Sequence, residues 1–134
     1  MKRLLLIISA MIMLLFSGCK KSEDKQNFSL VGKTYAATQY FGSYGSIVDP
    51  YTAYYVIRFT SNSTIECSDR ENGIHGPLLG TGRIVTGSYS LSYPNIHLEY
   101  DDPTLSTVHH SINAVFIDES CFRDSSTNRE YVLQ

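Results

Sequence analysis

The chain has 134 residues, of which 43% are hydrophobic, 18% are charged and 12% are aromatic, and its formal net charge is −2. This length fits one domain. The near balance of charge excludes a nucleic-acid-binding protein that works by neutralising phosphates, and the apolar and aromatic content excludes a disordered chain.

Residues 1–19 have the pattern of a bacterial lipoprotein signal. Lys2 and Arg3 form a short basic region, and an apolar run follows over residues 4–16. This run is shorter than the ~20 residues that a membrane-spanning helix needs, but it suits a signal peptide. It ends in Phe16-Ser17-Gly18-Cys19, which resembles a lipobox. We therefore expect removal of residues 1–18 and attachment of acyl chains such as palmitate at Cys19; an uncleaved N-terminal anchor is the alternative.

Residues 19–27 are predicted to be a polar tether between the lipid and the following domain, because residues 20–26 include no core-forming side chain. Within them, Ser22-Glu23-Asp24 resembles the short acidic signal that sends some lipoproteins to the outer face of the outer membrane. We therefore expect a lipid-anchored protein of the outer membrane. From Phe28 onward the chain carries 6 basic and 11 acidic residues, so the lipid, and no basic patch, must hold it at an anionic membrane.

Residues 28–134 are predicted to form one all-β domain. No stretch after Phe28 keeps a helical apolar period, and β-branched and aromatic residues dominate. Recurrent turn clusters separate about eight short strands, which favours an antiparallel up-and-down barrel or a sandwich. The expected strands are residues 33–40, 53–60, 64–69, 83–92, 95–100, 107–117, 121–124 and 129–133.

Side-chain alternation predicts three hairpins, because an apolar row must share one face. Their turns lie at residues 101–107, at residues 125–128 and between Phe59 and Ile65. The expected opposite pairs are Ile96–Ile112, Leu98–His110, Tyr100–Val108 and Glu99–His109 in the first hairpin, and Asp124–Arg129, Arg123–Glu130 and Phe122–Tyr131 in the second, with Ile57, Phe59, Ile65 and Cys67 inward in the third. Three consistent hairpins favour the up-and-down order.

Four segments resemble, in order, the lipocalin-like domains of small bacterial lipoproteins. They are Leu30-Val-Gly-Lys-Thr-Tyr35, Val56-Ile-Arg-Phe-Thr-Ser-Asn-Ser-Thr-Ile-Glu66, Gly87-Ser-Tyr-Ser-Leu91 and Asn95-Ile-His-Leu98. Tyr35 stands where the opening motif of that family usually has Trp. The resemblance covers most of residues 30–133. It implies an eight-stranded lipocalin-like barrel and, for most members, no established ligand or activity.

Cys67 and Cys121 remain once Cys19 is assigned to lipid. A disulfide between them would close a loop of ~50 residues and stabilise the exported domain by ~4 kcal/mol. Two buried free thiols are the alternative, because the pattern places Cys67 among inward apolar residues and leaves the direction of Cys121 open. No Cys-X-X-Cys or Cys/His spacing predicts a metal site.

The residues most suited to binding lie near one end of the predicted barrel. The long connections 41–52 and 70–82 share that end, because both are odd-numbered connections of a meander. The first is rich in tyrosine, whose flat ring and hydroxyl tip suit glycans, peptides or aromatic ligands, although tyrosines also cover half-buried sheet faces. The second is glycine-rich and predicted to be a flexible lid. The candidate ligand-binding residues are Tyr40, Tyr44, Tyr51, Tyr54, Tyr55, His75 and His110.

The remaining polar groups each have a structural alternative. His110, inside the barrel beside Tyr100, either contacts a polar ligand group or is a core histidine satisfied by a neighbouring hydroxyl. His97, Glu99 and His109 either converge on a metal or form solvated surface pairs. No phosphate loop, nucleophile elbow or suitably paired carboxylates are recognisable. We therefore expect no catalytic residues, metal or cofactor.

Together these patterns predict a lipid-anchored module of the cell envelope that binds a small ligand or glycan at one barrel mouth. The alternative is an accessory lipoprotein with a packed interior that contacts another envelope protein. A cavity lined by tyrosine, isoleucine and His110 would favour the first, and a filled interior with an exposed apolar patch would favour the second.

Overall fold

The computed structural model describes residues 28–42 and 49–134, and every regular element in this part of the chain is a β-strand. The strands are β1 (Thr34–Phe41), β2 (Tyr51–Phe59), β3 (Thr64–Glu71), β4 (Val85–Ser92), β5 (Asn95–Asp101), β6 (His109–Asp118), β7 (Cys121–Asp124) and β8 (Glu130–Leu133). The predicted signal peptide and tether, with Cys19, lie outside the described residues, as does Tyr44. Within the described ranges, no helix is long and apolar enough to cross a membrane.

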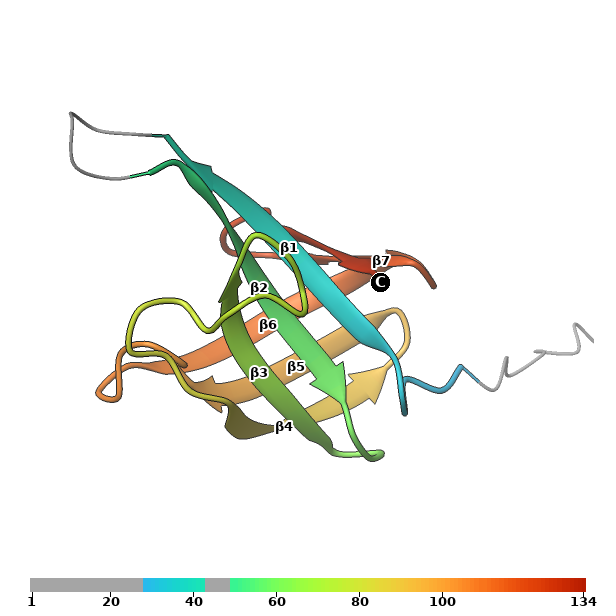
Figure 1. The fold of residues 1–134 in the computed structure, drawn as a ribbon. Helices are drawn as coiled ribbons and strands as arrows, with labels where there is room; N and C mark the ends of the chain where they lie inside the picture. Colours follow the sequence, from blue (N-terminus) through green and yellow to red (C-terminus); the bar gives the residue numbers. More distant parts are fainter. Residues whose placement is uncertain (1–27, 43–48) are drawn as a thin grey trace, which may run out of the picture.

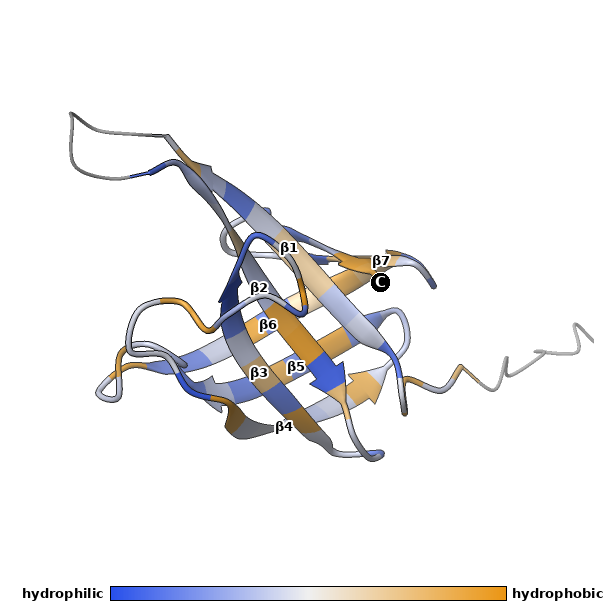
Figure 2. Ribbon diagram, in the orientation of Figure 1, coloured by the Kyte–Doolittle hydropathy of each residue, from blue (hydrophilic) through white to orange (hydrophobic). Residues whose placement is uncertain are grey.

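The eight strands form a closed antiparallel barrel (Figure 1). Each strand pairs with the next along the chain, and β8 pairs back with β1, where Tyr35 lies opposite Leu133 and Ala36 opposite Val132. The predicted up-and-down barrel is therefore confirmed. Hydrophobic and hydrophilic residues alternate along several strands (Figure 2), as expected when alternate side chains face the interior and the solvent.

Two of the three predicted hairpin registers are confirmed. Phe122 lies opposite Tyr131 and Arg123 opposite Glu130 on β7 and β8. Phe59 faces Ile65 on β2 and β3, and all four residues predicted to be inward in that hairpin are buried.

The predicted β5–β6 register is wrong by two residues. Leu98 lies opposite Ile112, Tyr100 lies opposite His110, and His109 pairs with Asp101 instead of Glu99. The cause is the position of the connection after β5, which spans residues 102–108 instead of 101–107 and in which Asp102 accepts hydrogen bonds from the amides of Thr104 and Leu105. A shift of two residues keeps every side chain on its face, so the inward row is as predicted.

One end of the barrel, which we call the closed end, is filled by aromatic side chains. Phe28 packs edge-on against Tyr93 and Phe116, with ring centroids 5.1 and 5.0 Å away. The buried Tyr35 hydroxyl donates a hydrogen bond of 2.7 Å to the carbonyl oxygen of Glu119 in the β6–β7 turn. These contacts fix the start of the domain to the end that carries the β2–β3, β4–β5 and β6–β7 turns. We call the opposite end the mouth.

Cys67 and Cys121 are both free, so the disulfide left open above is not formed. Cys67 points inward from β3, whereas Cys121 lies half-buried beside the inward-facing Phe122 of β7 and therefore points outward. The two thiols thus lie on opposite sides of the sheet, on strands that are not neighbours. Burial raises the pKa of the Cys67 thiol, which keeps it protonated.

The aromatic core predicts a large effect of Phe122→Ala. Phe122 is fully buried, with its ring stacked on Tyr131 at 4.9 Å and tilted against Tyr35 at 5.2 Å. Its truncation should lower the free energy of unfolding by about 3–5 kcal/mol, measured by urea titration. Ile117→Ala, at a 52% exposed position, is the control and should change it by less than about 1 kcal/mol. Equal effects of the two variants would contradict this description of the core.

Candidate ligand-binding site

The mouth of the barrel leads into a polar cavity of about 430 Å³. Its walls come from β2, β3 and β5 to β8, and its rim from the β5–β6 and β7–β8 connections. The lining residues are Tyr55, Asp69, Tyr100, Asp102, Pro103, His109, His110, Ser111, Ile112, Asp124, Ser126, Thr127, Arg129 and Tyr131. In Figure 1 the β3–β4 and β5–β6 connections lie toward the left, whereas the β2–β3 and β4–β5 turns lie toward the right.

The cavity exists because the inward row of several strands changes from apolar to polar toward the mouth. The inward residues run from Ile65 through Cys67 to Asp69 on β3, from Ile112 to His110 on β6, and from Phe122 to Asp124 on β7. Strand alternation directs these polar side chains into the barrel as strictly as it directs the apolar ones. Aromatic packing therefore stops part of the way along the interior.

The carboxylate of Asp102 is saturated by donors from its own loop and from β6. One oxygen accepts hydrogen bonds from the amides of Thr104 and Leu105, at 2.8 and 2.7 Å, and from the Thr104 hydroxyl. The other oxygen lies 2.8 Å from Nε2 of His110. Burial alone would raise the pKa of Asp102, but the bonds from His110 and the turn outweigh it and lower this pKa to about 2. Asp102 therefore fixes the conformation of the β5–β6 connection, which forms part of the cavity rim.

Asp124 has the same role in the β7–β8 connection. One of its oxygens accepts hydrogen bonds of 2.8 Å from the amide and the hydroxyl of Ser126, and the other accepts one of 2.7 Å from the Thr127 hydroxyl. Although Asp124 is buried, these bonds lower its pKa. The acceptors of this second carboxylate are also occupied.

Asp69 is the exception among the cavity carboxylates. The residue is only 8% exposed, and its carboxylate makes no hydrogen bond or ion pair with any of the residues that the structure describes, so its oxygens face the open space of the cavity. Burial, reinforced by the negative charge of Asp102, raises the pKa of Asp69 to about 6 despite the opposing effects of His110 and Arg129. Asp69 thus presents hydrogen-bonding capacity to the cavity that the protein itself does not use.

Aromatic rings and one guanidinium complete the walls. Arg129 lies over the ring of Tyr55, with 4.1 Å between the guanidinium carbon and the ring centroid, and the Tyr55 hydroxyl donates to Oε1 of Gln39. Tyr100 packs against the His110 ring at 5.0 Å. Burial raises the pKa values of Tyr55 and Tyr100, so both phenols stay protonated at neutral pH. The site therefore combines flat apolar surfaces with hydroxyl groups.

Of the seven residues predicted to bind a ligand, Tyr55 and His110 line the cavity. Tyr40 is 69% exposed, and Tyr51 stacks on Phe41 at 5.0 Å near the tip of the β1–β2 hairpin. Tyr54 is half-buried and is absent from the cavity wall. Tyr40 and Tyr51 lie on the part of β1 and β2 that extends beyond the other strands (Figure 1), whereas Tyr54, next to Tyr55 on β2, faces the outer side of the sheet.

His75 and the predicted lid also lie elsewhere. The amide of Glu71 donates to the carbonyl of Pro77, and that of Leu79 donates to the carbonyl of Asp69, so the connection after β3 folds back along this strand. Ile74 and His75 consequently lie over the outer surface of β1 to β3, beside Val56 and Ser68. This part of the connection covers the outside of the barrel and not its mouth.

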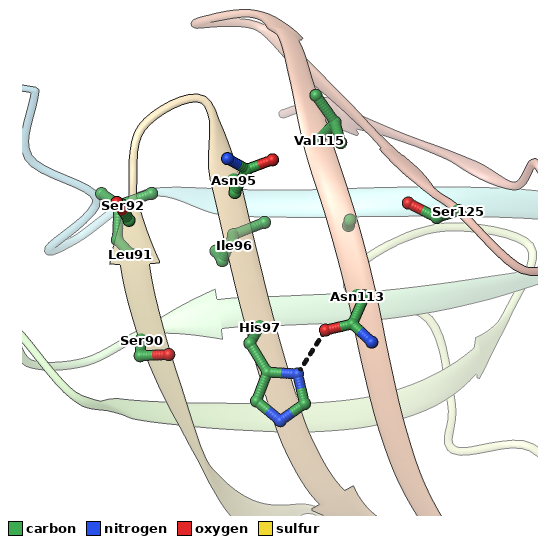
Figure 3. A pocket seen from close by; sticks show the side chains of 10 residues that line it. Ser90, Leu91, Ser92, Asn95, Ile96, His97, Asn113, Val115 and Ser125 are labelled. Carbon is green, nitrogen blue, oxygen red and sulfur yellow. Dashed lines mark hydrogen bonds between the residues drawn. The ribbon is translucent and has the colours of Figure 1, made fainter.

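The metal alternative for His97, Glu99 and His109 is not supported by the geometry. His97 contacts Glu99 at 3.2 Å and Asn113 at 2.8 Å, whereas His109 pairs with Asp101 at 3.0 Å. The His97–Asn113 bond lies in a shallow hollow on the outside of β4 to β6 (Figure 3). No group of three His, Cys, Asp or Glu side chains within residues 28–42 and 49–134 could hold a metal ion.

Asp69, Asp124 and Arg129 line the cavity but were not predicted as site residues from the sequence. A usable signal was present, because each lies two positions from an inward strand residue: Cys67, Phe122 and Tyr131, respectively, with Arg129 just before the start of β8. Asp102 and the size of the cavity carry no such signal, since both depend on how the connections close over the barrel end.

The fold and this site define an up-and-down β-barrel with an open polar cavity at one end. Comparison of the chain with protein-family models, with curated proteins and with solved structures finds no match.

The raised pKa of Asp69 predicts that Asp69→Asn changes the free energy of unfolding by an amount that depends on pH. The pKa of Asp69 is about 6 in the folded barrel and about 3.9 in an unfolded chain, so the wild type loses stability as pH rises from about 4 to about 6. The Asn variant does not lose stability in this way, because its side chain has no carboxyl group to titrate. Relative to the wild type, it should gain about 1–2 kcal/mol between pH 4 and pH 8 in urea titrations.

Glu66→Gln is the matched control for this measurement, because it removes the same charge from the outer, solvent-exposed side of β3. No comparable gain with rising pH is expected for it. A difference between Asp69→Asn and the wild type that stays constant over this range would show that the Asp69 carboxylate is solvated.

Proposed function

We propose that this protein is a binding protein of the cell envelope, anchored by lipid on Cys19, and that a small polar ligand occupies the cavity at the barrel mouth. The observation that carries the proposal is the cavity itself. Its volume of about 430 Å³ falls within the range of small-molecule sites, and its wall combines tyrosine rings with a few convergent polar groups. The position of this cavity at the barrel mouth, with Tyr55 and His110 in its wall, supports this proposal over the accessory-protein alternative, which predicts a packed interior.

The position of the domain start fits an anchored receptor. Phe28, the first described residue, packs at the closed end against Tyr93 and Phe116 (Figure 1), and this end is opposite the cavity. A lipid on Cys19 would therefore hold the closed end toward the membrane and leave the mouth facing the aqueous phase. The lipocalin-like resemblance and the lipobox support the same proposal.

Anchoring through Cys19 predicts that Cys19→Ala moves the protein out of the membrane fraction, or stalls its processing with the signal peptide retained. The measurement is membrane fractionation with mass spectrometry of the full chain in a Gram-negative host. Cys121→Ala, which removes a half-buried thiol from the barrel, is the control and should stay membrane-bound. Unchanged fractionation and mass in Cys19→Ala would overturn the anchor.

Binding at the mouth predicts a contrast between two adjacent tyrosines. Tyr55 lines the cavity and Tyr54 does not, so only Tyr55→Ala removes a wall of the site. The full chain in detergent micelles is titrated by NMR with aryl-alkyl ammonium, carboxylate and alcohol compounds and with methyl glucosides. At least one class should shift the amide signals of Tyr55, Ser111 and Arg129. For that class, Tyr55→Ala should weaken binding by at least about fivefold, and Tyr54→Ala by less than about twofold. Signals at the mouth that respond to none of the four classes would overturn the binding function.

A further inference from the structure

We propose that the ligand of the mouth cavity is a small organic cation, an ammonium or amidinium group on a flat apolar body, and that the Asp69 carboxylate pairs with its charge. This inference rests on the proposed binding function and specifies the ligand class of that same cavity. It follows from which acceptors in the cavity are occupied, from the balance of charge and from the shape of the walls.

Asp69 is the cavity carboxylate that remains available. The oxygens of Asp102 and Asp124 accept hydrogen bonds from turn amides and hydroxyls and from His110. Those of Asp69 have no donor among the residues described, and the residue, which is 8% exposed, lines the cavity. An ionised carboxylate with little access to water and no protein donor is costly, and a cation that enters the cavity lowers that cost.

The balance of charge in the cavity favours a cation over an anion. Three aspartates line it, against the single guanidinium of Arg129, which already lies over the Tyr55 ring. The two histidines that also line it are each paired with an aspartate, Asp101 or Asp102. An anion that approached Arg129 would also approach these carboxylates. The domain as a whole carries 6 basic and 11 acidic residues from Phe28 onward, so its field attracts cations toward the mouth.

The walls favour a flat apolar body attached to the cationic group. Tyr100, Tyr131 and Ile112 line the cavity. The Tyr100 ring packs at a tilt against His110, with 5.0 Å between the centroids, and the Tyr131 ring stacks on Phe122 at 4.9 Å. Rigid aromatic faces bind flat groups at little cost in side-chain entropy and attract cations through their ring electrons. A neutral sugar would also donate hydrogen bonds to Asp69, but it would leave the carboxylate charge uncompensated.

The test compares three probes that share one apolar body: 2-phenylethylammonium, 2-phenylethanol and phenylacetate, with methyl glucoside as a fourth. Each is titrated into the full chain in detergent micelles by calorimetry at pH 7.5, and NMR shifts of Tyr55, Ser111 and Arg129 locate the binding. The wild type should bind the ammonium probe at least tenfold more tightly than the alcohol, and the carboxylate probe more weakly still. This comparison needs no variant and therefore does not depend on how a substitution folds.

Two variants assign the preference to Asp69. Asp69→Asn keeps the shape of the side chain, and it should reduce the affinity for the ammonium probe at least tenfold while changing that for the alcohol less than about threefold. Glu66→Gln, on the outer side of the same strand, should keep the wild-type preference. Micelle binding is common to all three proteins and cancels in the comparison.

The outcomes separate this inference from the proposed function. If the alcohol, phenylacetate or glucoside binds at the mouth as tightly as the ammonium probe, or if Asp69→Asn keeps the preference, the cation assignment is wrong and the binding function stands. If none of the four probes shifts the mouth signals, both fall.

Discussion

Hydrogen bonds between β1 and β8 close the sheet, and this closure decides the chemistry of everything inside it. Once Tyr35 pairs with Leu133 and Ala36 with Val132, every second side chain of eight strands must enter one enclosed volume. Polar residues in those rows cannot turn to the solvent without moving the apolar residues of the same strand out of the core. The buried positions of Asp69 and Asp124 are therefore consequences of the alternation that buries Cys67 and Phe122.

Apolar and polar inward side chains occupy different ends of the barrel interior. At the closed end, aromatic rings fill the space and the polar tip of Tyr35 reaches a backbone carbonyl. At the mouth, Asp102 and Asp124 are stabilised by turn amides and hydroxyls, which shape the rim. Asp69 receives no such donor among the described residues, and the space in front of it stays open. The closed end thus contributes most of the aromatic packing that stabilises the fold, and the mouth carries the unfilled space and the available polar group.

Period-two alternation was enough to predict the eight strands, their order and the inward position of His110, because each of these depends on neighbours along the chain. Three features depend on tertiary arrangement and were not predictable. The loop that Asp102 organises shifted the β5–β6 register by two residues. The projection of β1 and β2 beyond the barrel carried Tyr40 and Tyr51 away from the mouth, although their ring chemistry suited binding. The cavity itself gathers residues from six strands, which no local pattern connects.

The central claim is that Asp69 is buried at the mouth without a protein donor, whereas Asp102 is saturated. A carbon-detected NMR titration of the aspartate side-chain carboxyls in the full chain tests it most directly. The Asp69 carboxyl should titrate with a pKa of about 6 and the Asp102 carboxyl with a pKa of about 2. An Asp69 pKa near 3.9, the value of a carboxyl in water, would contradict the claim, because it would mean that solvent or an unrecognised donor already satisfies the group.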